Sequence, residues 1–599
     1  MVRLERAPDL AAAIRDRAVR QRGGGEALLR HAAIALFALA LGLFIVYPMG
    51  EILARSLRDE TGRFVGLQNF VRYARTPAIA ASVTNSLFVA FVSMVVTVSL
   101  AFAYAYALTR TRMPGQAVFR IVAMLPLFAP SLVQAFAFVY VFGNNGIFTR
   151  LTGVNVGIYG AKGIVLAEVF SCFPHALLIL MAALSATDAR LYDAARTLGA
   201  SPLRTFLTVT LPGVKFGLAS ACFVVFTAVI TDFGAPKVIG GRFSVMATEI
   251  YNQVSGQQNF TMGSTVSVVL LVPALLAFAV DRLVQRRQHA LVTASSRPLV
   301  PASRPLADAG GFSYCAVVAA IIAGIYLVIL VSSLVVRWPY DLTPTLRHYR
   351  FDTVGGYAPL LNSLHVAAWT AVVGTAVTFA GAYLVEKCRS AASGPLYLVS
   401  ILPVSIPGMV LGLAYIFAFN QPRSPLHALY GTLAILVISN VVHYFTVGFL
   451  TAMTALKQMD AEFEGVSASL GVPFYRTFWR VTVPIALPSI VGISMYFFLN
   501  AMVTLSAVVF LVAPGTELAA VAVLLMDDAG DTAQAASMSV LIIALGLAVR
   551  LGYGIVLRGI ARRTQAWTRA GAPAPEAPHA GLRPGGERPG GAMEEGGRA

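Results

Sequence analysis

The chain has 599 residues, of which 57% are hydrophobic and 12% charged, and its formal net charge is +17. A typical soluble protein carries roughly 25% charged residues, so this chain has too little charge to cover the surface of a soluble fold. The composition excludes a disordered or ordinary cytosolic protein and predicts an integral membrane protein, whose basic excess marks cytoplasmic loops and not nucleic-acid binding.

Six apolar runs in the first half of the chain are long enough to cross a bilayer, which takes about 20 residues. They lie near 31–53, 83–108, 118–142, 163–186, 214–238 and 263–281. The basic segment 1–30 precedes them, and we expect it to be cytoplasmic. Residues 31–288 are therefore predicted to form one half of the molecule.

The loop 187–214, between the fourth and fifth spans, has the pattern of a helix, a sharp turn and a second helix. Asp188 can cap the first helix, which has an apolar face made of Leu191, Ala194, Ala195 and Leu198. Gly199 is expected to end this helix, because glycine adopts the left-handed conformation readily. Ser201-Pro202 then begins the second helix, and Pro212 marks the start of the fifth span.

Residues 289–311 are rich in Ser, Pro and Ala, and this composition predicts a cytoplasmic linker to a second half, residues 312–558. Six further spans are predicted there, near 312–336, 363–386, 396–419, 431–456, 486–512 and 536–557. The tail 559–599 is rich in Pro and Gly, and we expect it to be disordered. Both termini are predicted to be cytoplasmic, because that placement puts most of the basic residues on the inner side.

The second half repeats the loop design in residues 458–486, between the tenth and eleventh spans. Phe463, Val466 and Leu470 form the apolar face there, and Gly471 is the stop. The spacing from the glycine to the proline is the same in both loops, since 212 − 199 and 484 − 471 both equal 13.

Other motifs recur at a fixed offset. Asn85-Ser86-Leu87 opens the second span and Asn362-Ser363-Leu364 the eighth, and 362 − 85 is 277. Leu125-Pro126 in the third span and Leu402-Pro403 in the ninth have the same offset, since 403 − 126 is 277. Because six spans are an even number, both halves have the same orientation, which is a parallel repeat with a pathway between the halves.

At these loops the chain resembles the permease subunits of binding-protein-dependent ABC importers. Their cytoplasmic signature has Glu-Ala-Ala, then a glycine, then a proline at fixed spacing. The first loop is similar to it at Asp193, Ala194, Ala195, Gly199 and Pro212, with Asp in place of Glu, and the second at Gly471 and Pro484. The second loop departs from the signature at its start, where Gly465-Val466-Ser467 stands and Glu464 lies one residue early.

The resemblance implies an all-α membrane fold of twelve helices in two parallel six-helix repeats, the type I importer permease fold. It also implies that the two loops dock onto a homodimeric cytoplasmic ABC ATPase, and that an extracytoplasmic binding protein delivers a small-molecule substrate to a multi-pass protein of the bacterial inner membrane. The chain has no phosphate-binding loop of the G-x-x-x-x-G-K-[ST] type. We therefore expect no cofactor and no enzymatic activity of its own, with ATP hydrolysed by the partner.

Other functions fit less well. A loop helix could instead lie on lipid headgroups, although two copies at equivalent places disfavour this. A twelve-span secondary transporter is the main alternative class, but the loop LTRTRMPGQAVFR lacks the basic motif frequent in that class. A membrane enzyme is disfavoured, because no catalytic motif occurs in the loops.

The substrate is predicted by resemblance alone. The fused twelve-span form is similar to permeases for ferric iron and for 2-aminoethylphosphonate, and the stretch 231–263 favours the phosphonate group. Ferric iron or another small solute is the alternative. Lys237 and Arg242 lie near the predicted outer face, where they either meet headgroups or attract an anion.

Four polar residues within the spans are candidates for the pathway. They are Gln134, Asp232, Asn440 and Asn500. Asn85 and Asn362 are expected to hydrogen-bond between helices, and His175 and His443 to be structural.

Overall fold

The computed structural model describes residues 25–288, 299, 301, 303–388, 390–422, 424–460 and 462–564. Across these residues the fold is all-α apart from one short hairpin, β1 (Val335–Arg337) with β2 (Asp341–Pro344). Eleven helices in the described ranges are long and apolar enough to cross a membrane, and one bent helix pair raises the number to twelve. The predicted membrane fold and span count are confirmed.

The first half begins with the long helix Gly25–Ser56, whose last part is α2 (Tyr47–Ser56). The helices that follow it are α3 (Gln68–Arg75), α4 (Pro77–Arg110), α5 (Gln116–Ala123), α6 (Ser131–Phe142), α7 (Ile147–Thr152), α8 (Ala161–Ser185), α9 (Ala189–Thr197), α10 (Pro202–Thr205), α11 (Leu211–Thr231), α12 (Gly234–Ile239), α13 (Met246–Tyr251) and α14 (Phe260–Gln288).

The second half repeats this order, with the hairpin after its first helix. Its helices are α15 (Pro305–Ser333), α16 (Ala358–Glu386), α17 (Ser393–Ile401), α18 (Gly408–Phe419), α19 (Leu433–Lys457), α20 (Glu462–Ser469), α21 (Phe474–Thr477), α22 (Val483–Val503), α23 (Ala519–Asp528) and α24 (Thr532–Thr564). Thus α9 corresponds to α20, and α4 to α16.

The third and ninth spans are broken helices and not the continuous ones predicted. A short 3-10 turn, Leu125–Phe128, separates α5 from α6, and Leu402–Ser405 separates α17 from α18, with a bend of 113°. Each break holds the repeated Leu-Pro, and a second proline immediately precedes each new helix. Proline removes a backbone donor and clashes with the preceding turn, so the paired prolines end one helix and start another within the bundle.

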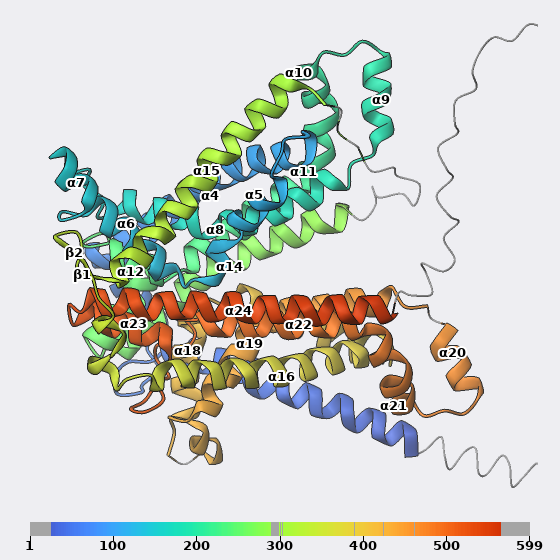
Figure 1. Cartoon of the computed structure of the whole chain (residues 1–599). Helices are drawn as coiled ribbons and strands as arrows, with labels where there is room; N and C mark the ends of the chain where they lie inside the picture. The colour runs from blue at the N-terminus through green and yellow to red at the C-terminus, as the bar shows by residue number, and fades with distance from the viewer. Residues whose placement is uncertain are drawn as a thin grey trace, which may run out of the picture.

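The first span of each half packs against the other half. Tyr415 Oη, on α18, donates to the carbonyl of Phe44 at 2.9 Å, and α2 packs on α18. In the same way α15 packs on α4, α5 and α6, and Tyr314 Oη donates to the carbonyl of Leu100 at 2.9 Å. In Figure 1, α15 accordingly lies with α4, α5 and α8. The halves are continuous in sequence but exchange their first spans in space.

Both predicted loops lie at one end of the bundle. Figure 1 shows α9 and α10 at the same end as α20 and α21, with β1, β2, α7, α12 and α23 at the other. We call these the loop end and the hairpin end. The loop end also holds the end of α24 and the start of the first span, since the backbone amide of Phe474 donates to Glu26 Oε1 at 3.0 Å.

Several predicted boundaries shift. The first helix starts at Gly25, within the predicted segment 1–30, and α15 starts at Pro305, within the predicted linker. Likewise α24 continues to Thr564, into the predicted tail. Apart from residues 299, 301, 303 and 304, the remainder of those three segments lies outside the described residues, so their predicted character stays a prediction.

The fifth and eleventh spans end earlier than predicted. Helix α11 ends at Thr231 and α22 at Val503, where the predicted spans reach 238 and 512. The sequence could not reveal these ends, because the residues after each helix are also hydrophobic and buried. Helix α12 follows α11, and a run of turns follows α22.

Candidate functional site: two equivalent loops and a pocket between the halves

The first loop folds as its sequence predicts. Asp188 Oδ1 accepts from the amide of Arg190 at 3.0 Å and caps α9. Gly199 has a φ of 67°, and the following amide, Ala200, donates to the carbonyl of Ala195 at 2.9 Å. This is the hydrogen bond of a glycine-terminated helix. Ser201 Oγ then accepts from the amide of Arg204 at 3.3 Å and caps α10.

The second loop has the same geometry with different chemistry. Gly471 has a φ of 65°, and the amide of Val472 donates to the carbonyl of Ser467 at 2.9 Å. Pro473 stands where the first loop has its serine cap, and Glu26 of the first span supplies the acceptor for Phe474 instead. The two loops thus reach one shape by different local contacts.

The predicted prolines do not interrupt the helices. A single π-helical turn, Phe206–Thr210, precedes Leu211-Pro212, and Phe478–Thr482 precedes Val483-Pro484. Each π turn shifts the hydrogen bonding by one residue, so that the amide of Leu211 donates to the carbonyl of Phe206. The proline is accommodated, and the helix runs on from Pro202 to Thr231 and from Phe474 to Val503.

The predicted apolar faces of the two loop helices point outward. Leu198 is 85% exposed and Leu470 is 74% exposed, at positions separated by the same 272 residues as the two glycines (470 − 198 and 471 − 199). Leu191 and its counterpart Phe463 are exposed as well. Asp193 and Ala194 are also exposed, whereas Ala195 is buried against the loop. Apolar side chains at the loop end are therefore left uncovered in both halves.

A polar pocket of about 250 Å³ lies where the two halves meet. It is lined from the first half by the broken third span and by α8 and α11, and from the second half by α18, α19 and α22. Its polar lining residues are Ser131, Ser171, His175, Thr231, Asp232, His443, Tyr444, Asn500, Thr504 and Ser506. Parallel repeats are expected to hold a substrate at such a place.

Comparison with known proteins decides the family. Residues 99–290 and 362–562 each match the family described as binding-protein-dependent transport system inner membrane component. The chain belongs to this family, with two copies of its domain. The relatives that it is similar to include the ferric transport system permease protein FbpB of Actinobacillus pleuropneumoniae, at 28% identity over 87% of this chain and 77% of that protein.

Two further relatives bear on the substrate. The putative ferric transport system permease protein FbpB 1 of Haemophilus influenzae is 28% identical over 81% of this chain and 78% of its own length. The putative 2-aminoethylphosphonate transport system permease protein PhnU of Salmonella typhi is 24% identical over 42% of this chain and 89% of its own length. The ferric relatives span both halves of this permease, whereas the phosphonate relative covers less than half of it.

The structure brings two of the four predicted pathway residues into the pocket of this permease. Asp232 accepts from Ser131 Oγ at 2.8 Å and from the amide of Ala235 at 3.0 Å, and Asn500 lines the opposite wall. Gln134 and Asn440 are fully buried and do not line it. Gln134 Nε2 instead donates to the carbonyl of Pro126 at 3.2 Å, within the break of the third span.

Sequence reasoning missed several residues of this site. His175 and His443, expected to be structural, line the pocket, and so does Tyr444, whose hydroxyl lies 2.6 Å from Thr504 Oγ1. Glu168, a buried acid on α8, lies beside Asp232. The sequence could have identified Glu168, because an acid inside an apolar span is a functional candidate by default.

The repeated Asn-Ser pairs hold the hairpin end of the permease together. Asn85 Nδ2 donates to the carbonyl of Ser244 at 2.9 Å, and Asn362 Nδ2 to the carbonyls of Gly515 and Glu517, both at 3.1 Å. Ser86 Oγ accepts from the first amide of α13 and Ser363 Oγ from the first amide of α23, both at 2.8 Å. The pairs therefore tie the second span of each half to the buried helix near its own end.

Proposed function

We propose that this permease is the membrane-spanning subunit of an ATP-driven importer, which works with a homodimeric cytoplasmic ATPase and an extracytoplasmic binding protein. The observation that carries the proposal is the pair of loops. They share one geometry, lie at one end of the bundle, and expose apolar side chains at equivalent positions. A symmetric partner with two equivalent grooves fits such a pair better than a lipid surface does.

This proposal sets the orientation. The start of the first span and the end of α24 lie at the loop end, which supports our proposal that the loop end and both termini are cytoplasmic. The hairpin end then faces the binding protein. No residue of this chain is proposed to hydrolyse ATP.

We propose ferric iron as the substrate, in preference to the 2-aminoethylphosphonate favoured by the resemblance of residues 231–263. Two relatives that span both halves are named for ferric transport. Asp232, His175 and His443 line the pocket, but within the described residues no three His, Cys, Asp or Glu side chains lie close enough together to hold a metal ion, so the two relatives alone carry this choice of substrate.

One observation favours the phosphonate as a second candidate. The first residues of α6 and α18, Ser131 and Gly408, both line the pocket. The N-terminus of a half-helix attracts anions in transporters of this general design. Asp232 would then face the ammonium group of the zwitterion.

The test is uptake by cells that lack their own importers for either solute and express this permease with its ATPase and binding protein. We expect accumulation of radiolabelled ferric iron that requires an active ATPase, and a large loss of uptake in Asp232→Asn. The matched control is Glu60→Gln, an exposed acid outside the pocket, which should leave uptake unchanged. Accumulation of labelled 2-aminoethylphosphonate alone would select the second candidate. Uptake that survives an inactive ATPase and stops when the proton gradient collapses would instead indicate a secondary transporter.

A further inference from the structure

One cation in each half joins a loop helix to the second span. Arg110 is the last residue of α4, and Lys387 follows the last residue of α16. They are equivalent, because 387 − 110 is 277, the offset of the Asn-Ser motifs. Their partners, Tyr192 on α9 and Glu464 on α20, are also equivalent, because 464 − 192 is 272, the offset of the two loop glycines.

The first of these contacts is built on neutral partners. Arg110 Nη2 donates to the carbonyl of Leu184 at 2.8 Å and to Tyr192 Oη at 3.2 Å, and it also bonds the hydroxyl of Thr187. The guanidinium lies over the Tyr192 ring, 5.1 Å from its centre, a favourable cation–π arrangement. Tyr192 Oη in turn donates to Thr210 Oγ1 at 3.0 Å, within the π turn.

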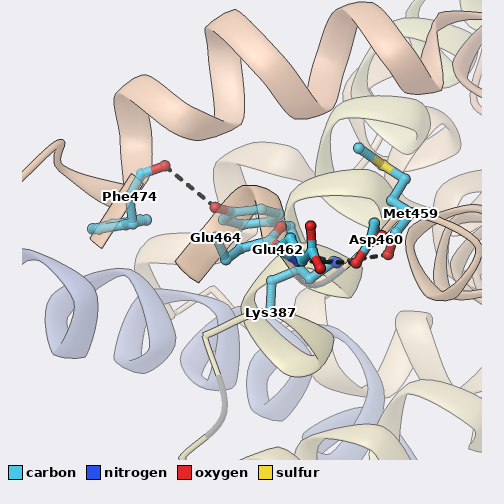
Figure 2. A network of polar contacts seen from close by, with 7 residues as sticks. Lys387, Met459, Asp460, Glu462, Glu464 and Phe474 are labelled. Carbon is cyan, nitrogen blue, oxygen red and sulfur yellow. Dashed lines mark hydrogen bonds and ion pairs between the residues drawn. The ribbon is translucent and has the colours of Figure 1, made fainter. Parts of the chain in front are cut away.

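The second contact is an ion pair. Lys387 Nζ lies 3.1 Å from Glu464 Oε2 and donates to the carbonyl of Met459 at 3.3 Å (Figure 2). The side chains of Lys387 and Glu464 are 10% and 25% exposed. The Glu464 side chain therefore points toward α16 of its own half. Glu464 is the counterpart of Tyr192, whereas the signature glutamate corresponds to Asp193.

Aromatic side chains add a second repeated contact between loop and span. The Phe206 ring, at the start of the π turn, packs on Phe102 and Tyr106 of α4, with ring centres 6.0 and 5.8 Å away. The equivalent set is Phe478 on Phe379 and Tyr383 of α16, at 5.9 and 4.9 Å. Each loop is thus fixed to the second span on both sides of its glycine turn.

The second spans lead from these contacts to the hairpin end. The same helices α4 and α16 carry the Asn-Ser pairs that bond α13 and α23. Helix α4 also packs along α8 and α11, and α16 along α19 and α22, and these four helices line the pocket. A displacement of a loop helix that is fixed to α4 or α16 would therefore move the walls of the pocket.

We propose that Arg110 and Lys387 are positioning residues that fix α9 and α20 to the ends of α4 and α16, so that movement of each loop reaches the pocket through the second span. This inference rests on the proposed function, since it assumes an ATPase that moves the loops. The first contact uses hydrogen bonds and a ring face, and the second uses charge. Only the second can be restored by exchanging its two residues.

The experiment measures substrate transported per ATP hydrolysed in the reconstituted complex of permease, ATPase and binding protein. We expect Lys387→Met and Lys387→Glu each to lower this ratio by about fivefold or more, the lower range of typical coupling effects. The reversed pair Lys387→Glu/Glu464→Lys should return the ratio to within about twofold of the wild type, as should Lys387→Arg, because each keeps opposite charges in contact. Binding of the ATPase should be retained in all of these variants, so that a lower ratio reports coupling and not assembly.

The matched control is Lys457→Met, because Lys457 is an exposed cation that lines the same loop-end pocket as Lys387. It should keep the wild-type ratio. In the first half, Arg110→Met should lower the ratio as Lys387→Met does, and Tyr192→Phe, which keeps the ring but loses the hydroxyl, should have a smaller effect.

A native cysteine gives a second readout. Cys388 is 7% exposed and lies beside Lys387 and Glu464 in a pocket at the loop end. Burial raises the pKa of this thiol to about 11, and thiols react as thiolates. Alkylation of Cys388 should therefore be slow in the wild type. It should be faster in Lys387→Met, because α20 and its turn, which help to enclose this pocket, are then no longer held to α16 and the thiol loses cover. Cys388→Ser gives the background.

The outcomes separate the two proposals. Wild-type uptake that does not depend on ATP overturns the proposed function, and this inference with it. ATP-dependent wild-type uptake, with Lys387→Met and Arg110→Met at the wild-type ratio, overturns this inference alone. A reversed pair no better than Lys387→Glu also overturns it, since the contact would then have no role as a contact.

Discussion

At the scale of single residues, the two loop glycines have the same role, which is to end a loop helix in the left-handed conformation. Their φ values of 67° and 65° lie in the left-handed region, and a Cβ at either position would meet nothing within 4 Å. Backbone conformation, and not crowding, is therefore what requires glycine there. This much was readable from the sequence, because glycine at the end of an amphipathic helix has few other uses.

We predict that substitutions at these glycines rank by their tolerance of positive φ. Gly199→Asn should keep most uptake, because asparagine adopts the left-handed conformation more readily than other side chains. Gly199→Val should lose most of it. Gly199→Asp and Gly471→Asp should impair coupling for a different reason, because they add a charge beside the exposed Leu198 and Leu470, while the permease still folds. ATP-dependent uptake and the thermal midpoint of each purified variant provide the check. Equal loss in the Asn and Val variants would show that something other than backbone conformation matters.

Asp527 makes stability depend on pH. Burial, reinforced by the charge of Asp528 and opposed by that of Lys237, raises its pKa to about 6 from an ordinary value of 3.8. Between these values the folded state keeps a proton that the unfolded state releases. Stability is therefore lost as pH rises through this window, and the loss is complete above the folded pKa.

Asp527→Asn should accordingly raise the thermal midpoint in detergent near neutral pH, with the gain shrinking to nothing at about pH 4. Asp528→Asn is the control, because Asp528 lies 3.2 Å from Lys237 and its loss removes an ion pair. That control should give no such gain. A benefit of Asp527→Asn that is independent of pH would contradict the assignment.

At the scale of elements, the sequence predicted the hydrophobic spans and the loops but not the breaks. The repeated Leu-Pro and its following proline were visible, yet hydrophobicity runs evenly across them. Each break brings the start of a helix close to a residue that is distant in the sequence. A Cβ on Gly234 would lie 2.4 Å from Ser131 Oγ, and a Cβ on Gly408 would lie 2.3 Å from Ser506 Oγ. The serine and glycine have exchanged places between the halves, so single-sequence periodicity could not reveal the contact.

This exchange predicts a rescue. Gly234→Ser should lower the thermal midpoint, because two side chains would then compete for one space. The double variant Ser131→Gly/Gly234→Ser copies the second half and should recover most of the loss. Thermal unfolding of the purified permease measures both. A double variant no more stable than Gly234→Ser would mean that the two positions do not share this constraint.

The pocket shows the same limit of sequence reasoning. Asp232 and Asn500 were predicted and lie in it, because polar groups in apolar spans stand out. Gln134 and Asn440 stood out equally but face buried neighbours, and His175 and His443 were set aside because their spacing excluded a metal site. Which face of a span meets the other half depends on helix packing, and hydropathy does not encode it.

At the scale of the molecule, the repeat alone suggested two self-contained halves, whereas the structure interleaves them. The first span rests on α18, and α15 rests on the first half, where the carboxylate of Asp308 accepts from the amide of Arg112 at 2.8 Å. Sequence periodicity cannot tell whether the first span of each half packs on its own half or on the other one, since the order of spans along the chain is the same in both cases. The exchange couples the two halves, because neither first span can follow one half without contacting the other.

This arrangement predicts how a divided chain behaves. A permease cut in the segment 289–304, between α14 and α15, should assemble and transport when both pieces are expressed together. Each piece alone should be degraded, because its first span loses the part of its packing surface that the other piece supplies, and the helices that the missing first span would cover are left exposed. Membrane levels of each piece by immunoblot, and ATP-dependent uptake of the pair, measure the outcome.

A second variant tests the exchanged contacts themselves. Tyr314→Phe with Tyr415→Phe removes the two hydroxyls that donate across the exchange, at 2.9 Å each. These changes should weaken assembly of the cut pieces while leaving the uncut chain folded. Stable accumulation of either piece by itself would show that the halves are independent and that the exchanged spans add no essential contact.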